Sequence, residues 1–383
     1  MIKTLQLFFK GLSTTLIIAI PAMAESESSD LKLPLKKLAP LHFDFHLGAY
    51  NTKETTYRSS GVTSKVTLYS KFLIDDSFVL TITPVASFIS GQQVSRDPES
   101  PLTNSLYLKE ANIAIPFSDD KDNNSQITIG ALDQKNHLPG AIGYTKSFPG
   151  VLLSSPVLNT ENFKQAINLN YAIPTSSGLA NSSNELDNSA TLITAGMLTK
   201  QIWHPQLQSS IGANYYAFNN LTSKMASDSL SKGNSVQRVN SDSHLFLNQY
   251  RGYELTSQFS WNNEQNTWGI NSKINYLNNT EVKKDKNDGL FLSVAPHKQL
   301  NAKYRLYTNL KYSRVESDAM VAVFMDNAYG RTNRETNSIE LKLESQSYAF
   351  EIEFSSSKII KTNPFQNKDQ SIFLSLELNN VAF

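Results

Sequence analysis

From residue 41 onward, apolar and polar side chains alternate at every second position over long stretches. Between residues 62 and 74, Val62, Val66, Leu68 and Phe72 share one parity, and Thr, Lys and Tyr fill most of the other. Successive side chains of a β-strand point to opposite faces, so each such stretch predicts a strand with one apolar and one polar face. No amphipathic helix is predicted after residue 40. The chain is therefore predicted to be all-β.

The alternating stretches are about twice as long as strands of soluble sandwiches, which average ~5–6 residues. Strands that cross a membrane need roughly 9–11 residues, and they must close into a barrel because an open edge in lipid leaves backbone groups unpaired. The fold predicted is a transmembrane antiparallel β-barrel of sixteen strands, with eighteen as the alternative count. The sixteen strands are predicted at 41–51, 62–74, 78–90, 104–117, 125–134, 149–157, 162–173, 190–203, 206–219, 248–262, 266–277, 288–306, 309–325, 335–345, 347–358 and 369–383.

The boundaries between residues 288 and 325 depend on register. Apolar residues hold the even positions from Leu290 through Leu306, which favours one long strand, 288–306, with a turn at Tyr307-Thr308. This choice gives an even number of strands and places both ends of the barrel on the periplasmic side. The connections then alternate between short periplasmic turns and long external loops. The long loops are predicted at 52–61, 91–103, 135–148, 174–189, 220–247, 278–287, 326–334 and 359–368.

The first 24 residues form a predicted signal peptide, with Lys3 and Lys10 before an apolar run that ends at Ala22-Met23-Ala24. The run is too short for a membrane helix, so cleavage after Ala24 is expected to release the protein. Residues 25–40 are predicted to be an N-terminal periplasmic segment, and 41–383 the barrel. The chain has no Cys, and its 35 basic and 34 acidic residues nearly balance, so neither disulfides nor nucleic-acid binding is expected.

The last strand ends in SIFLSLELNNVAF, with Phe383 as the final residue. In this feature, together with the signal peptide and the alternation, the sequence resembles Gram-negative outer-membrane porins. The resemblance implies that Phe383 is the signal read by the barrel-assembly machinery. It also implies an outer-membrane protein, either a monomer or a homotrimer, that passes small hydrophilic solutes by passive diffusion without a cofactor. The apolar register shifts at Asn379-Asn380, which predicts a bulge there.

The same resemblance implies that the third external loop, 135–148, folds into the lumen and narrows it. The constriction residues would then be Lys135, His137, Tyr144 and Lys146. The alternative is an ordinary loop that lies over the mouth.

Charged residues on the polar faces are predicted to line the lumen, where they keep their hydration and influence which ions pass. Basic residues on the second, seventh, eleventh and twelfth predicted strands and acidic residues on the fourteenth and fifteenth suggest a lateral field across the lumen, with scattered, unselective charges as the alternative. The predicted lumen-lining residues are His42, Asp44, His46, Lys65, Lys71, Glu110, Lys164, Glu254, Lys273, Lys303, Arg305, Glu340, Glu344, Glu351 and Glu353.

Residues 41–50, LHFDFHLGAY, place His42, Asp44 and His46 on one face of a strand, about 6.6–6.8 Å apart along it. This spacing permits a metal site. However, apolar residues fill the other face without exception, and further ligands would have to come from a neighbouring strand. The wall-lining interpretation is favoured, and no metal is expected.

Two other functions stay open. A barrel hydrolase would assemble its site from separate strands, although GxSxG and HExxH motifs are absent. A barrel adhesin or structural protein would use the long loop 220–247 as a binding surface. We predict a channel and not an enzyme. Trp203, Trp261, Trp268, Tyr276 and Phe354 are predicted to form interfacial girdles, with a sugar-binding slide as the alternative.

Overall fold

The computed structural model describes residues 35–37, 42–54, 58–74, 78–93, 104–117, 125–134, 140–142, 147–175, 189–239, 243–326 and 331–382. The barrel belongs to a compact unit, Lys36–Phe383. A short strand, β1 (Leu35–Lys37), falls within the predicted N-terminal segment. The predicted signal peptide, 1–24, and the terminal Phe383 lie outside the described residues.

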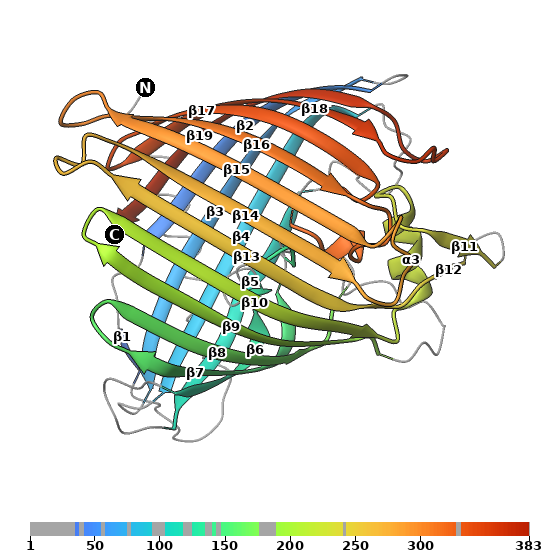
Figure 1. Cartoon of the computed structure of the whole chain (residues 1–383), viewed down its shortest axis with the longest axis horizontal. Coiled ribbons are helices and arrows are strands. Elements are labelled where there is room, and N and C mark those ends of the chain that lie inside the picture. The colour runs from blue at the N-terminus through green and yellow to red at the C-terminus, as the bar shows by residue number, and fades with distance from the viewer. Residues whose placement is uncertain are drawn as a thin grey trace, which may run out of the picture. The chain divides into compact units, whose positions relative to one another are not determined.

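In the described part of the chain, sixteen antiparallel strands, β2 to β10 and β13 to β19, form a barrel that closes between β19 and β2 (Figure 1). The first nine are β2 (His42–Glu54), β3 (Arg58–Ile74), β4 (Phe78–Gln93), β5 (Ser105–Pro116), β6 (Gln126–Leu132), β7 (Phe148–Asn159), β8 (Phe163–Ala172), β9 (Thr191–His204) and β10 (Leu207–Asn219). The remaining seven are β13 (Tyr250–Asn262), β14 (Trp268–Asn279), β15 (Asp288–Gln299), β16 (Arg305–Val315), β17 (Arg334–Glu344), β18 (Tyr348–Ile359) and β19 (Asp369–Ala382). The predicted fold class and strand number are confirmed.

One end of the barrel carries short turns, and we call it the turn end; the other carries most of the long connections, and we call it the loop end. The turn end includes two-residue and five-residue turns, at 205–206 and 263–267. In the second, Asn266 has φ 53° and the Asn263 side chain accepts hydrogen bonds from the N–H groups of Thr267 and Trp268. The loop end includes a connection, 220–249, with helix α3 (Ser223–Leu230) and a hairpin of β11 (Val236–Arg238) and β12 (His244–Phe246). The predicted long loop 52–61 is wrong, because β2 and β3 leave only 55–57 between them.

The largest error in the predicted strands lies between residues 300 and 325. A turn spans 300–304, where the Asn301 side chain accepts hydrogen bonds from the N–H groups of Lys303 and Tyr304. Because the turn has five residues, even-numbered residues of β15 pair with even-numbered residues of β16, and both sets face outward. Leu290 on β15 and Leu306 on β16 therefore share a parity although they lie on different strands. This coincidence produced the incorrect strand 288–306. The second predicted strand, 309–325, is also wrong, because β16 ends at Val315.

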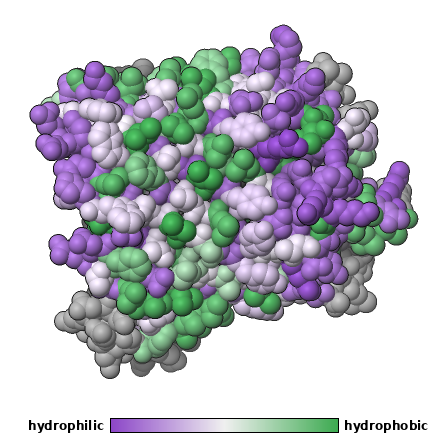
Figure 2. Space-filling view, viewed as in Figure 1, coloured by the Kyte–Doolittle hydropathy of each residue, from purple (hydrophilic) through white to green (hydrophobic). Residues whose placement is uncertain are grey.

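The outer face of the wall is apolar, as the alternation predicts. Leu47, Ile211, Leu255, Ile274 and Leu310 are between 40% and 62% exposed on this face. In Figure 2, hydrophobic residues gather over the central part of the visible face, and hydrophilic residues gather toward its two ends. This distribution matches a band of wall in contact with lipid.

Aromatic residues cluster on the outer face at the turn end. Trp203 and Trp268 are 61% and 52% exposed, and Trp268 makes an edge contact with Trp261 at 4.6 Å between ring centroids. Also at the turn end, Tyr304 of the 300–304 turn and Tyr348 at the start of β18 hydrogen-bond through their hydroxyls at 2.8 Å. Amphipathic rings at this level are typical of a membrane interface. No helix in the described residues is long and apolar enough to cross a membrane.

Candidate functional site

The candidate site is the inner wall of the barrel, and the strand register defines it. Residues that pair directly across antiparallel strands lie on the same face. Glu377, His46 and Lys65 form one such row across β19, β2 and β3, and the even parity of β2 therefore faces inward. By the same reasoning, fourteen of the predicted residues lie on the inner face: His42, Asp44, His46, Lys65, Lys71, Glu110, Lys164, Glu254, Lys273, Arg305, Glu340, Glu344, Glu351 and Glu353. Lys303 does not, because it sits in the 300–304 turn.

The His42, Asp44 and His46 stripe faces the lumen without forming a metal cage. The His42 ring stacks on Tyr69 at 4.8 Å between centroids, and the His46 ring stacks on Phe373 at 6.0 Å. Among the described residues, the one group of three or more ligand-type side chains whose ligand atoms converge lies elsewhere, on β17 and β18. The stripe is therefore part of the wall.

We expect calorimetric titration of the folded protein with Zn²⁺ to show no tight binding at this stripe, because stacking orients the two imidazoles onto different rings. His46→Ala is the comparison variant. A tight site in the wild type that disappears in His46→Ala would contradict the wall interpretation.

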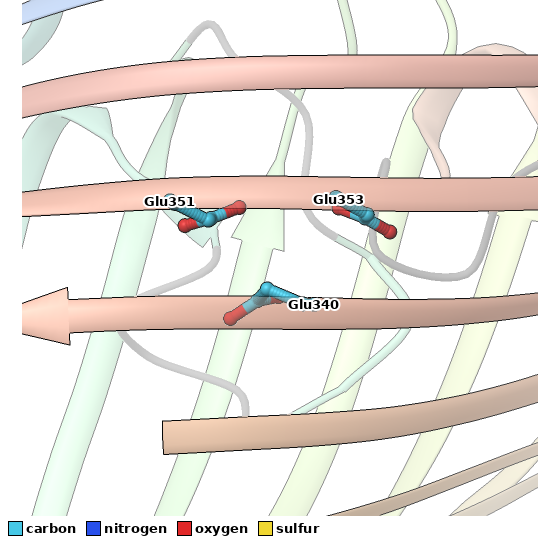
Figure 3. Close-up of side chains that lie close together, drawn as sticks. All are labelled: Glu340, Glu351 and Glu353. Atoms are coloured by element: carbon cyan, nitrogen blue, oxygen red, sulfur yellow. The ribbon is translucent and has the colours of Figure 1, made fainter. Parts of the chain in front are cut away.

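Three carboxylates converge on the inner faces of β17 and β18 (Figure 3). Oxygen atoms of Glu340, Glu351 and Glu353 lie within 4.8 Å of one another. The Lys311 ammonium on β16 pairs with Glu340 and lies 3.4 Å from Glu353. The acid cluster, as we call these three glutamates, thus carries one internal counter-charge, and like charges at this spacing repel each other.

The apolar content of the lumen was not predicted. Residues 316–326, which we call the inserted segment, leave β16 and pack against the inner wall near the loop end. A short 3₁₀ turn, η1 (Ala322–Phe324), forms its middle. Ala319 to Met325 are all 6% exposed or less. Their apolar neighbours on the wall include Phe148, Leu192, Tyr216, Leu277 and Phe291.

Asp318 is the main polar anchor of the inserted segment. This carboxylate is fully buried, and it accepts hydrogen bonds from the Ser235 N–H at 2.8 Å, the Tyr250 hydroxyl at 3.0 Å and the Asn248 amide at 3.1 Å. Its backbone carbonyl accepts another from the Asn279 amide at 2.8 Å. Charge-assisted hydrogen bonds of this kind are the stronger class, so they fix the start of the segment.

Asn234, the residue before Ser235, holds the middle of the inserted segment. Its amide N–H₂ donates to the carbonyls of Ser317 and Met320 at 2.6 and 2.8 Å, and its carbonyl oxygen accepts from the Ala322 N–H at 2.7 Å. The Tyr216 hydroxyl donates to the Ala319 carbonyl at 2.8 Å. Backbone N–H and C=O groups of the inserted segment thus find hydrogen-bond partners although the segment is not regular secondary structure, as buried backbone requires.

The described part of the third loop, 140–142, packs against the inserted segment and its apolar wall neighbours, and we call this whole group the apolar cluster. The Ala141 N–H donates to Glu254 Oε1 at 2.6 Å, and Ile142 forms an isolated bridge with Met325. The Asp326 N–H donates back to the Ala141 carbonyl at 2.7 Å. Glu254 is therefore a wall residue that binds a loop. The predicted constriction residues Lys135, His137, Tyr144 and Lys146 lie outside the described residues.

A polar recess of about 460 Å³ occupies the inner wall from β15 to β3, beside the apolar cluster. One row of directly paired residues in it consists of Ser338, Ser355, Ser371, Thr52 and Ser59. Arg334 and Asp369 form an ion pair at the edge of this recess nearest the loop end, and Arg334 is only 3% exposed. The described lumen is therefore divided into an apolar side and a hydroxyl-rich side.

Comparisons with solved structures agree with this geometry. The chain is similar to OprB of Pseudomonas putida, with a TM-score of 0.58 and 10% identity over 89% of this chain and 93% of that one. It is also similar to OmpF of Salmonella typhi, with a TM-score of 0.51 and 10% identity over 88% and 97%. The fold is of the outer-membrane porin type.

A third similar structure of the porin-type fold is the outer membrane channel DcaP of Acinetobacter baumannii, with a TM-score of 0.50 and 11% identity over 92% of this chain and 99% of that one. No family model matches the sequence, and no curated protein matches it. The likeness therefore concerns the fold, and the function must be argued from the residues of the wall.

Proposed function

We propose that the protein is a diffusion channel of the Gram-negative outer membrane, which passes small hydrophilic solutes through a water-filled lumen. The observation that carries this proposal is the division of a closed wall into an apolar outer face and an inner face with fourteen of the fifteen predicted charged or histidine residues. Thirteen of these fourteen residues are at least partly exposed, and Glu254 alone is buried, where it accepts the Ala141 N–H. Inner-face charges without such a partner need water, because burial of unpaired charge is costly. The loop end would face outward and the turn end the periplasm.

The lumen would be narrowed from one side. The inserted segment and residues 140–142 support an inward position for the seventh and third loops, since both bind inner-wall residues. In this proposal Lys135, His137, Tyr144 and Lys146 flank the narrowed passage, and solutes pass along the hydroxyl-rich side between β15 and β3. Selection would depend on the width of that side, its hydrogen-bonding groups and its charges.

The hydrolase alternative has weaker support. Ser227 Oγ and His244 lie 2.9 Å apart, a distance that suits a nucleophile and its base. Within the described residues, no carboxylate forms an ion pair with His244, so a third member of a triad is missing. The pair also lies in the 220–249 connection, where Met225 of α3 packs on the apolar cluster. A structural role accounts for it.

We expect purified protein to give discrete, ohmic single-channel steps in planar bilayers, because an open lumen conducts ions in proportion to voltage. The same sample should change its gel mobility on boiling, since a closed barrel resists unfolding by detergent. A protein that shows the mobility shift but no steps at several salt concentrations would be a sealed barrel and would overturn the proposal.

A further inference from the structure

Three lysines lie in one row of directly paired residues across the inner wall. Lys164 on β8 pairs directly with Lys200 on β9, and Lys273 lies on β14. The three line a recess of about 510 Å³ at the turn-end half of the lumen, which we call the basic recess. From the sequence, Lys164 and Lys273 were predicted to line the lumen but not to share a recess, and Lys200 was not predicted to be part of a site.

The pairing of Lys164 with Lys200 is unfavourable by itself, because like charges directly opposite on neighbouring strands repel. Within the described residues, no carboxylate lies within 4.0 Å of either ammonium. Glu161 is the one acidic residue of the recess lining, and it forms no ion pair with Lys164 or Lys200. This lysine pair therefore presents a positive charge that a bound anion would neutralise.

The rest of the lining supplies hydrogen-bond donors. Gln258 and Asn271 lie beside the lysines, and the Ser210 hydroxyl donates to the Gln258 carbonyl oxygen at 3.5 Å, which leaves the Gln258 amide N–H₂ available. The Ser260 hydroxyl donates to the Asn271 carbonyl oxygen at 2.7 Å, which leaves the amide N–H₂ of Asn271 available to a ligand. Amide donors beside ammonium groups are the chemistry that recognises oxyanions.

The apolar cluster comes near the basic recess at Lys273. Phe291 belongs to that cluster, and the Lys273 ammonium lies 5.8 Å from its ring centroid. Apolar walls screen charge poorly and concentrate the field inside a cleft. The acid cluster cannot cancel the field at Lys164 locally, because β18 lies eight strands from β8 in the sixteen-stranded ring and thus on the opposite wall.

We propose that the basic recess is a binding site for small polyvalent oxyanions, reached through the turn-end mouth. The proposal rests on the proposed function, because it requires an open lumen. It extends that function by giving the channel a preferred solute class on one wall. The anion would bridge Lys164 and Lys200 while Lys273 and the amide donors contact its other oxygens.

The test is block of single-channel current by inorganic phosphate and by tripolyphosphate, added to one side of the bilayer at a time. We expect concentration-dependent block, stronger for tripolyphosphate and stronger from one side, because the recess lies near one mouth. The double variant Lys164→Gln/Lys200→Gln should weaken the apparent affinity by about tenfold or more, since two charges in close contact are lost. Lys164→Arg/Lys200→Arg should retain the block.

Lys71→Gln is the matched control. Lys71 also faces the lumen near the turn end, on β3 at a different part of the wall, and the substitution removes one positive charge outside the recess. It should leave the block nearly unchanged. Absence of block by tripolyphosphate in a conducting channel, or block that survives in the glutamine double variant, would overturn the oxyanion site. Absence of any conductance would instead count against the proposed function.

Discussion

Replacing residues 319–325 by a Gly/Ser sequence of equal length is expected to raise the single-channel conductance several-fold. The substitution keeps Asp318 and the length of the connection but removes the side chains that hold it in the lumen. Met320, Val321, Val323, Phe324 and Met325 are each 5% exposed or less, and burial of such a side chain contributes about 1.5–3 kcal/mol. Without that contribution, nothing offsets the loss of conformational entropy on ordering the segment. The segment should therefore leave the lumen.

The control for this prediction is Leu245→Ser/Leu247→Ser. These leucines belong to the same end of the barrel but are 50% and 55% exposed, so their replacement removes apolar surface without releasing the inserted segment. The single-channel conductance of this double variant should equal that of the wild type. An unchanged conductance in the 319–325 variant, with its gel mobility shift intact, would mean that the inserted segment does not limit the passage.

The predicted strands agree with the structure where the wall alternates, because a strand between lipid and water has a different solvent on each face. The strand predicted over 206–219 is observed as Leu207–Asn219, for example. The run from Ala319 to Met325 does not alternate, and this was the available signal that it is no lipid-facing strand. Both faces of the inserted segment are buried in protein, so its side chains follow no period of two. The prediction of strand 309–325 failed for this reason.

The faces of the wall residues could be predicted, but their neighbours could not. Parity places Lys65 and Lys164 on the inner face, whereas the closure of the barrel decides what lies beside each of them. Closure through β19 and β2 puts Lys65 in one row with His46 and Glu377, on the acidic side of the lumen. The lateral separation of charge predicted from sequence is therefore partial. Lys164 lies across from the acid cluster and Lys65 lies near it.

Neutralising the acid cluster with Glu340→Gln/Glu351→Gln/Glu353→Gln is expected to shift the reversal potential in a KCl gradient toward anions. The three carboxylates lie close together on one wall, and only Lys311 among the described residues forms an ion pair within the cluster. Their removal leaves Lys311 as an uncompensated positive charge facing the lumen. The amide keeps the size of each side chain, so the width of the passage should change little.

Lys311→Gln should shift the same potential in the opposite direction, toward cations, because it removes the counter-charge and leaves all three carboxylates. It should also lower the resistance of the barrel to unfolding, since mutual repulsion of the glutamates is then unrelieved. Glu335→Gln is the matched control. Glu335 pairs with Lys358 at 3.0 Å and has the outward parity of β17, so its neutralisation should leave the reversal potential unchanged.

Salt concentration distinguishes this electrostatic origin from a change in pore width. The Debye length falls from about 10 Å at 0.1 M to about 3 Å at 1 M, which is shorter than the distance across a barrel lumen. Both shifts should therefore be large in dilute KCl and small in concentrated KCl. A shift of constant size at all salt concentrations, or shifts of the same sign in the glutamine triple variant and in Lys311→Gln, would show that the acid cluster does not set the ion preference of this channel.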